Sequence, residues 1–107
     1  MPLYSHSILI VESEVSSFAR SLRAAIKRQG GEPFVARDAV MALELAKQAR
    51  FSAALVNADH VDLVDRLQMP VLLYGKRPPP LVVPFVSMPA RPAKLALAVE
   101  RLLQTAQ

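Results

Sequence analysis

The chain contains no cysteine and no tryptophan among its 107 residues, and it has only three glycines. Without cysteine it forms neither a disulfide nor a thiolate metal site, which fits the cytoplasmic location that we expect. Three glycines are too few for a glycine-rich loop that holds phosphate. His6 and His60 are far apart in sequence, without acidic or thiol partners at the spacing of metal ligands. No metal site and no cofactor are therefore predicted.

Long hydrophobic runs are missing as well. No apolar stretch approaches the roughly 18 residues that suggest a membrane span, and the first residues lack the basic start and cleavage site of a secretory signal. Hydrophobic residues make up 52% of the chain and charged residues 21%, a balance typical of a compact fold. Residues 1–107 are predicted to form a single domain with one core and no output domain.

The formal charge of +4 favours attraction to acidic surfaces. The excess is small for a chain of this size. A solvated basic surface accounts for it, and nucleic acid is not the expected partner.

Short apolar runs alternate with segments of helical periodicity. The expected strands are Ser7–Val11, Phe34–Ala36, Phe51–Asn57, Pro70–Tyr74 and Leu81–Val86, the last interrupted by Pro84. The first expected helix is capped by Ser13 or Ser16 and runs to about Gln29. The other expected helices are Ala39–Arg50, which Asp38 caps, Asp59–Leu67 and Arg91–Ala106. The helix positions expected to face the core are Val15, Phe18, Leu22, Ala25, Ile26, Ala39, Ala42, Leu43, Ala46, Val61, Val64, Leu67, Leu95, Ala98, Val99 and Leu102.

The alternation of strands and helices predicts right-handed crossovers and a parallel sheet with helices on both faces, an α/β/α arrangement of three layers. The run Phe51–Asn57 lacks polar alternation, which is typical of a strand in the middle of such a sheet. Asn57 then lies at the carboxyl edge of the sheet, where open α/β folds bind ligands.

These elements resemble a response-regulator receiver domain, the flavodoxin-like phosphoacceptor module of two-component signalling. The similarity covers nearly the whole chain and is carried, in order, by Ile8–Glu14, Ala36–Leu45, Phe51–Asn57, Met69–Leu73 and Phe85–Pro89. The resemblance implies a five-stranded sheet of order 2-1-3-4-5 and a cis peptide bond between Met88 and Pro89.

The family's chemistry uses carboxylates that hold Mg²⁺, an aspartate nucleophile, a lysine and a Ser or Thr that reports phosphorylation. The nucleophile position falls on Asn57, whose neutral amide cannot form an acyl phosphate. The remaining positions fall on Glu12 and Ser13 (acidic pair, with Glu14 beside it), on Met88 (lysine), and on Tyr74 or Gly75 (Ser/Thr).

These substitutions imply a cleft closer to electrical neutrality and a poor Mg²⁺ site. Asn57 either mimics one phosphorylation state or simply caps the following turn. Glu12 is expected to be a solvated loop carboxylate. Phosphorylation at Asp59, two residues further on, is geometrically unfavoured. Phe85 matches the family's aromatic switch position, although packing alone explains it.

A receiver carries a full helix between its fourth and fifth strands, whereas this chain has only Lys76–Pro80. Its absence should leave Val71, Leu73, Val83 and Phe85 underprotected, which predicts a dimer or partner contact there. The alternative is that the proline segment folds over the gap.

The resulting hypothesis is a non-catalytic pseudo-receiver that acts by protein–protein interaction. Its expected partner is a sensor kinase, a phosphotransfer protein, another regulator or a second copy. An enzyme is not predicted, because no nucleophile lies beside a base in the sequence. The possible partner surface consists of Val15, Phe18, Arg20, Val83 and Phe85, with Glu14 beside it.

The alternative function is a small regulator that binds nucleic acid or another polyanion, with binding that weakens steeply as salt rises. It would use the basic side chains of the first and last helices, namely Arg20, Arg23, Lys27, Arg28, Arg91 and Lys94.

Overall fold

The computed structural model describes residues 3–13 and 17–105. Its elements in chain order are β1 (Ser7–Val11), α1 (Ser17–Arg28), β2 (Glu32–Ala36), α2 (Ala39–Gln48), β3 (Ala53–Asn57), the 3₁₀ helix η1 (Ala58–Asp65), β4 (Val71–Gly75), β5 (Phe85–Ser87) and α3 (Pro92–Thr105). The predicted roles of Glu14, Val15, Ser16 and Ala106 lie outside the described residues.

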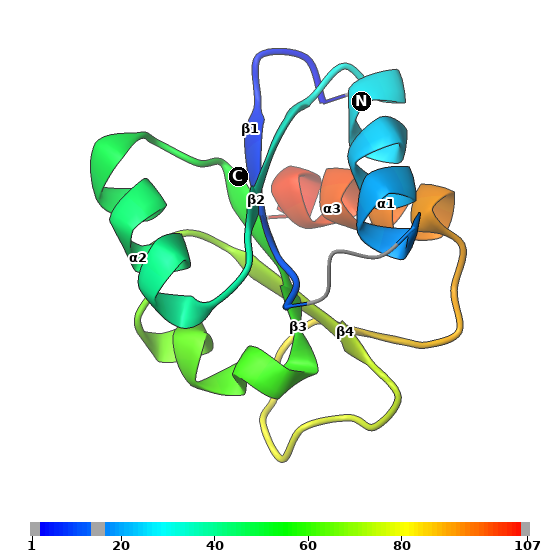
Figure 1. Cartoon of the computed structure of the whole chain (residues 1–107). Coiled ribbons are helices and arrows are strands. Elements are labelled where there is room, and N and C mark those ends of the chain that lie inside the picture. Colours follow the sequence, from blue (N-terminus) through cyan, green and yellow to red (C-terminus); the bar gives the residue numbers. More distant parts are fainter. Residues whose placement is uncertain (1–2, 14–16, 106–107) are drawn as a thin grey trace.

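The five strands form one parallel sheet of order β2-β1-β3-β4-β5, as predicted. Helices α1 and α3 lie on one side of this sheet, and α2 and η1 lie on the other (Figure 1). Val11 is paired with Val56, and Asn57 with Tyr74, so the carboxyl ends of β1, β3 and β4 are level. This three-layer arrangement is the predicted flavodoxin-like fold, and no helix connects β4 to β5.

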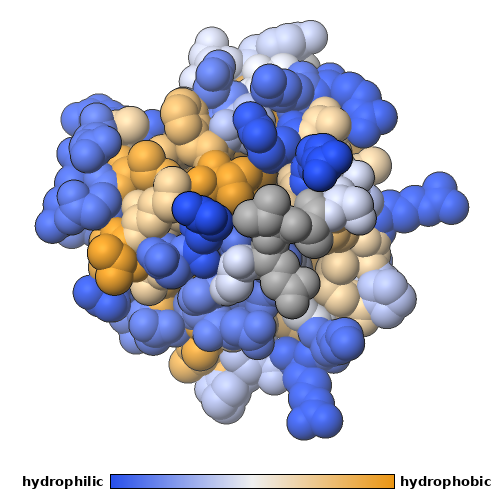
Figure 2. All heavy atoms as spheres, viewed as in Figure 1, coloured by the Kyte–Doolittle hydropathy of each residue, from blue (hydrophilic) through white to orange (hydrophobic). Residues whose placement is uncertain are grey.

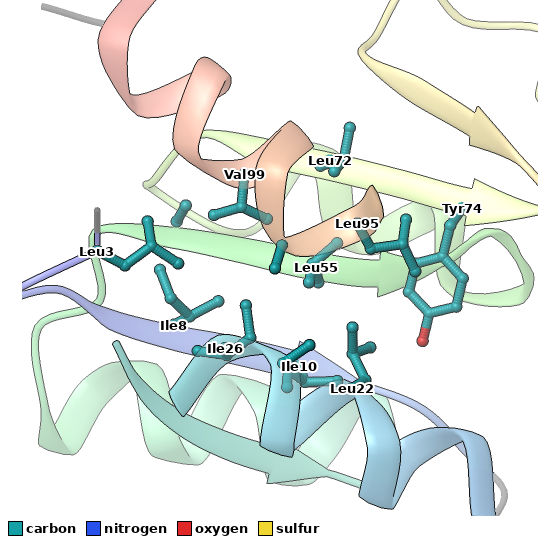
Figure 3. Packing of buried hydrophobic residues seen from close by; sticks show 13 residues of the cluster. Leu3, Ile8, Ile10, Leu22, Ile26, Leu55, Leu72, Tyr74, Leu95 and Val99 are labelled. Carbon is teal, nitrogen blue, oxygen red and sulfur yellow. The ribbon is translucent and has the colours of Figure 1, made fainter. Parts of the chain in front are cut away.

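The core between the sheet and the helices α1 and α3 is formed by side chains that alternate along the strands. Ile8, Ile10 and Leu55 point from the sheet toward this layer (Figure 3). They meet Leu22 and Ile26 of α1, and also Leu95 and Val99 of α3, all fully buried. The helical spacing of these residues makes one apolar stripe on each helix, which is why both helices pack here.

The opposite layer corrects the prediction that β4 is underprotected. Leu73 is 0% exposed and Val71 is 8% exposed, because Leu63 and Leu67 cover this side of the sheet. Val83 and Phe85 are half-buried against the same cluster. The short helix η1 therefore supplies the cover that was expected to be missing.

Helix η1 also differs from the predicted two-turn helix. It is a 3₁₀ helix with a break at His60 (φ −110°, ψ 38°). Leu63 is completely buried, and Val61 and Val64, predicted to face the core, are half-buried and pack against the same cluster. The other helix positions that are half-buried also pack against a core cluster as predicted, namely Ala39, Leu43, Ala46, Ala98 and Leu102.

Four strands differ from the prediction at their boundaries, β4 by one residue at each end. β3 begins at Ala53, and the preceding Phe51 packs edge-on against Phe34, with ring centroids 5.4 Å apart. β5 contains only Phe85–Ser87, so the predicted Leu81–Val83 part lies outside the sheet. Pro80 and Pro84, on either side of that part, have no backbone N–H for pairing. β2 in turn starts earlier than predicted, at Glu32, while the Asp38 cap of α2 is confirmed by its bond to the Met41 N–H, at 2.8 Å.

Exposed hydrophobic side chains gather in two places, while Tyr4 and Leu97 are exposed singly elsewhere. Figure 2 shows hydrophobic surface on the face formed by β2 and α2, where Phe34, Val40 and Met41 are exposed. The second place is the segment between β4 and β5, where Leu81 is exposed and Val82 completely so. Among the described residues, no helix is both long enough and apolar enough to cross a membrane.

The covering role of η1 can be tested with Leu63→Ala. Because Leu63 is completely buried against the sheet, this change should lower the free energy of unfolding by about 3 kcal/mol. Urea denaturation measures the loss. The control Val40→Ala, at a side chain that is 73% exposed, should change stability by less than ~0.5 kcal/mol. Equal effects of the two substitutions would contradict the packing described here.

Candidate functional site at the carboxyl edge of the sheet

A cleft of about 920 Å³ lies where β1, β3 and β4 end. Its lining contains all six residues at the degenerate phosphoacceptor positions, namely Glu12, Ser13, Asn57, Tyr74, Gly75 and Met88. The parallel register brings them together, since residues that follow level strand ends lie at the same edge. The start of α1, the start of η1 and the segment after β4 complete the walls.

The Asn57 side chain joins the elements at the centre of the cleft. Its Nδ2 donates a hydrogen bond of 3.0 Å to Oε2 of Glu12, and its Oδ1 accepts one of 2.9 Å from the backbone N–H of Asp59. The second bond caps η1, as one of the two interpretations of Asn57 predicted. An amide suits both bonds because it is a donor on one side and an acceptor on the other.

Glu12 is only 8% exposed, so the expectation of a solvated loop carboxylate is wrong. Its carboxylate is stabilised by the Asn57 amide, which compensates in part for the loss of water. Within residues 3–13 and 17–105, no three His, Cys, Asp or Glu side chains lie together as a metal site requires.

Tyr74 fills the inner part of the site. It is 1% exposed, its ring lies 5.9 Å from that of Phe18, and its hydroxyl points from β4 toward α1 (Figure 3). Burial raises the pKa of Tyr74 far above its usual range, and the negative charge of nearby Glu12 raises it further. Glu12 is close enough to influence the hydroxyl, but the two groups do not meet the geometry of a hydrogen bond, and the hydroxyl has no other partner in the described structure.

The sequence missed a contact between Ser13 and His60. Oγ of Ser13 lies 2.5 Å from Nε2 of His60, although the two residues are 47 positions apart. The premise that no nucleophile lies beside a base is therefore wrong. The pair is exposed to water, and it joins the loop after β1 to η1. His60 lies at the break in η1, and helical periodicity gives no signal of such a break.

The sequence also missed the basic residues of the cleft. Lys76 and Arg77 line it from the segment after β4, while the family's lysine position holds Met88. Among the lining residues within 3–13 and 17–105, Glu12 and Asp59 are acidic and Lys76 and Arg77 are basic. These described residues balance in charge, as the predicted near-neutral cleft requires, although the sequence did not indicate Lys76 and Arg77.

Other predicted site residues lie apart from the cleft. Phe85 and Val83 pack on the η1 side of the sheet, whereas Phe18 lines the cleft and Arg20 is exposed on α1. Val15 and Glu14 lie outside the described residues. The predicted cis bond between Met88 and Pro89 is confirmed.

Gly75 allows β4 and η1 to approach closely. A Cβ placed on Gly75 would lie 2.9 Å from the Cβ of Ala58. A larger side chain at this position would therefore separate the end of β4 from the start of η1.

Comparison with known proteins places this fold. No protein-family model matches the sequence, and no curated protein matches it. The structure is similar to the chemotaxis response regulator CheY4 of Vibrio cholerae (TM-score 0.78, 19% identity, 91% of this chain and 98% of that one). It is also similar to the receiver domain of the hybrid histidine kinase CckA (TM-score 0.78, 22% identity, 92% of this chain and 99% of that one). A third similar structure is the anti-anti-sigma factor PhyR of Bartonella quintana (TM-score 0.78, 18% identity, 99% of this chain and 51% of that one). The chain thus has the receiver-like fold that its sequence predicted.

The amide bridge can be tested with Asn57→Asp. The new carboxylate faces Glu12 without a donor, so we expect a loss of about 2 kcal/mol in unfolding free energy at neutral pH. Lower pH should restore part of the loss, because protonation of either carboxylate removes the repulsion. Millimolar Mg²⁺ should act in the same direction by binding between them.

The matched control is Asn57→Ala, which removes both hydrogen bonds without adding charge. Its loss of stability should not respond to Mg²⁺. Thermal unfolding with and without the ion distinguishes the variants. An Asn57→Asp protein as stable as the parent at neutral pH, in the absence of Mg²⁺, would contradict the role given to the amide.

Proposed function

We propose that the chain is a pseudo-receiver, a signalling module that acts by protein–protein contact without aspartyl phosphorylation. The observation that carries this proposal is the Asn57 amide, held between Glu12 and the Asp59 N–H where a phosphoacceptor would be required. An amide lacks the nucleophilic oxygen of a carboxylate. It also removes one of the negative charges that attract Mg²⁺.

The surroundings of Asn57 support the same conclusion. Met88 provides no cation at the family's lysine position, and Tyr74 places a buried ring in the region of the family's Ser/Thr position. The exposed Ser13–His60 pair does not change the proposal that the protein is not an enzyme. In the part of the chain that the structure describes, no acidic side chain hydrogen-bonds to the imidazole of His60, and orientation by a third group is what activates such pairs.

The proposed partner is a protein of a signalling pathway in the cytoplasm, such as a sensor kinase, a phosphotransfer protein or another regulator. The proposed docking surface is the start of α1, where half-buried Phe18 lies beside exposed Arg20. An apolar ring flanked by a cation suits an acidic helix of the partner. The similar PhyR structure is an anti-anti-sigma factor, which is consistent with this kind of role.

Incubation with acetyl phosphate and Mg²⁺, followed by intact mass measurement, tests the absence of phosphorylation. We expect no added phosphoryl group, while a phosphorylatable receiver in the same tube gains one. An adduct on this chain that survives in Asp59→Asn would overturn the proposal. An adduct that disappears in that variant would overturn it as well and would identify Asp59 as the acceptor.

We further propose that the chain forms a homodimer through the segment between β4 and β5. Leu81 and Val82 project from a segment that Pro78, Pro79 and Pro80 restrict, so little conformational entropy is lost when they are buried. Sedimentation at increasing concentration should show self-association that Val82→Ser weakens about tenfold, which corresponds to burial of one apolar side chain.

Val40→Ser is the matched control, because Val40 is also a largely exposed valine but lies on α2. It should leave the association unchanged. A monomer at every concentration, or equal weakening by both substitutions, would exclude this dimer.

One observation favours the alternative of polyanion binding. Arg20, Arg23, Lys27 and Arg28 are all exposed on α1, which contains no acidic residue. Arg91 and Lys94 are exposed at the start of α3, the helix packed beside α1. Binding of nucleic acid to these six residues would weaken steeply with salt. The proposed contact through Phe18 includes only one cation, Arg20, so it should weaken much less as salt rises.

A further inference from the structure

The cleft at the carboxyl edge has a volume of about 920 Å³, which falls within the roughly 300–1,000 Å³ of small-molecule pockets. Its lining also has the composition of such a pocket. Apolar side chains form its walls, buried Glu12 and Tyr74 form its base, and exposed Lys76 and Arg77 form its rim.

The walls are apolar and restrained. Phe18, Val61 and Met88 line one part of the cleft, and Pro79 and Pro80 line another. The proline rings fix their own backbone angles. A flat apolar molecule between these walls would order few flexible groups, which keeps the cost of binding low.

The base of the cleft contains two buried polar groups. Oη of Tyr74 has no hydrogen-bond partner in the described structure, which is unfavourable for a buried hydroxyl. Burial raises the pKa of Tyr74, so the hydroxyl stays protonated and can donate. The carboxylate of Glu12 lies nearby and accepts a hydrogen bond from Nδ2 of Asn57.

The rim carries the positive charges. Lys76 and Arg77 are exposed, and both belong to the cleft lining. An anionic group of a ligand would be attracted to them, while the buried Glu12 carboxylate repels an anion from the base. These charges fix the direction in which an acidic ligand enters.

We infer that this cleft binds a flat, amphipathic organic acid, with its anionic group at Lys76 and Arg77 and a hydroxyl group at Tyr74. The inference deepens the proposed function, on which it rests, because such a ligand would replace phosphorylation as the input of the module. The ligand would contact both the start of α1 and the segment between β4 and β5, the two proposed contact surfaces.

Hydroxynaphthoate is the probe, and naphthoate and the methyl ester of hydroxynaphthoate are its matched analogues. The probe is titrated into the isotopically labelled chain, and the backbone amide resonances are followed by NMR. We expect the amide resonances of cleft residues to shift. Loss of the hydroxyl and loss of the anionic charge should each weaken binding about tenfold, since each removes an interaction of about 1.4 kcal/mol. Absence of cleft shifts at millimolar probe would overturn the inference.

Variants test which residues bind the anionic group of the probe and which bind its hydroxyl group. Lys76→Gln with Arg77→Gln should weaken hydroxynaphthoate about tenfold and leave the uncharged ester unchanged. Arg23→Gln with Lys27→Gln on α1 removes the same charge and should change nothing. Tyr74→Phe should abolish much of the preference for hydroxynaphthoate over naphthoate. Equal weakening by both charge pairs would mean that the probe binds through general electrostatic attraction, and would overturn the inference.

The probe and the phosphorylation test give separate answers. If the mass is unchanged after acetyl phosphate and the probe does not bind, the proposed pseudo-receiver is retained and only the inferred ligand is rejected. A phosphoryl adduct would overturn the proposed function itself, whatever the probe does.

Discussion

The hydrogen bonds of the Asn57 side chain fix the geometry of the cleft. They connect the ends of β1 and β3 to the first turn of η1, and they keep the Glu12 carboxylate stable in a largely buried position. A carboxylate at residue 57 would need a cation beside it, because two negative charges at this distance repel strongly. The amide makes the site independent of such an ion.

The other residues around Asn57 suit a neutral side chain at this position. A lysine at residue 88 would find no negative partner in Asn57, whereas Met88 packs against the core. The Tyr74 ring lies beside that of Phe18. The cleft therefore has an aromatic and apolar wall next to the amide.

Most of the fold could be predicted from the sequence, because buried strands such as Ser7–Val11 appear as uninterrupted apolar runs and Asp38 is a strong capping signal. Parallel order then brings Glu12, Asn57 and Tyr74 to one edge. The errors arose where periodicity fails. The run Leu81–Val83 is β-branched and apolar, yet the prolines around it prevent pairing, and helical periodicity does not indicate the break at His60 in η1.

The cleft could be predicted only in part for the same reason. Residues that follow strand ends have positions fixed by the sheet, whereas Lys76, Arg77 and His60 reach the cleft through the path of their loops. Loop paths depend on local torsion angles and packing that a hydrophobic pattern does not encode. The Ser13–His60 contact is the clearest example, since neither residue belongs to an apolar repeat.

The missing side chain of Gly75 has a structural consequence. Ala58 lies directly against the bare backbone of Gly75, so the end of β4 and the start of η1 are in close contact. The segment Lys76–Pro80 therefore leaves the sheet from a position packed against η1, and the two elements that line this part of the cleft meet at a single glycine.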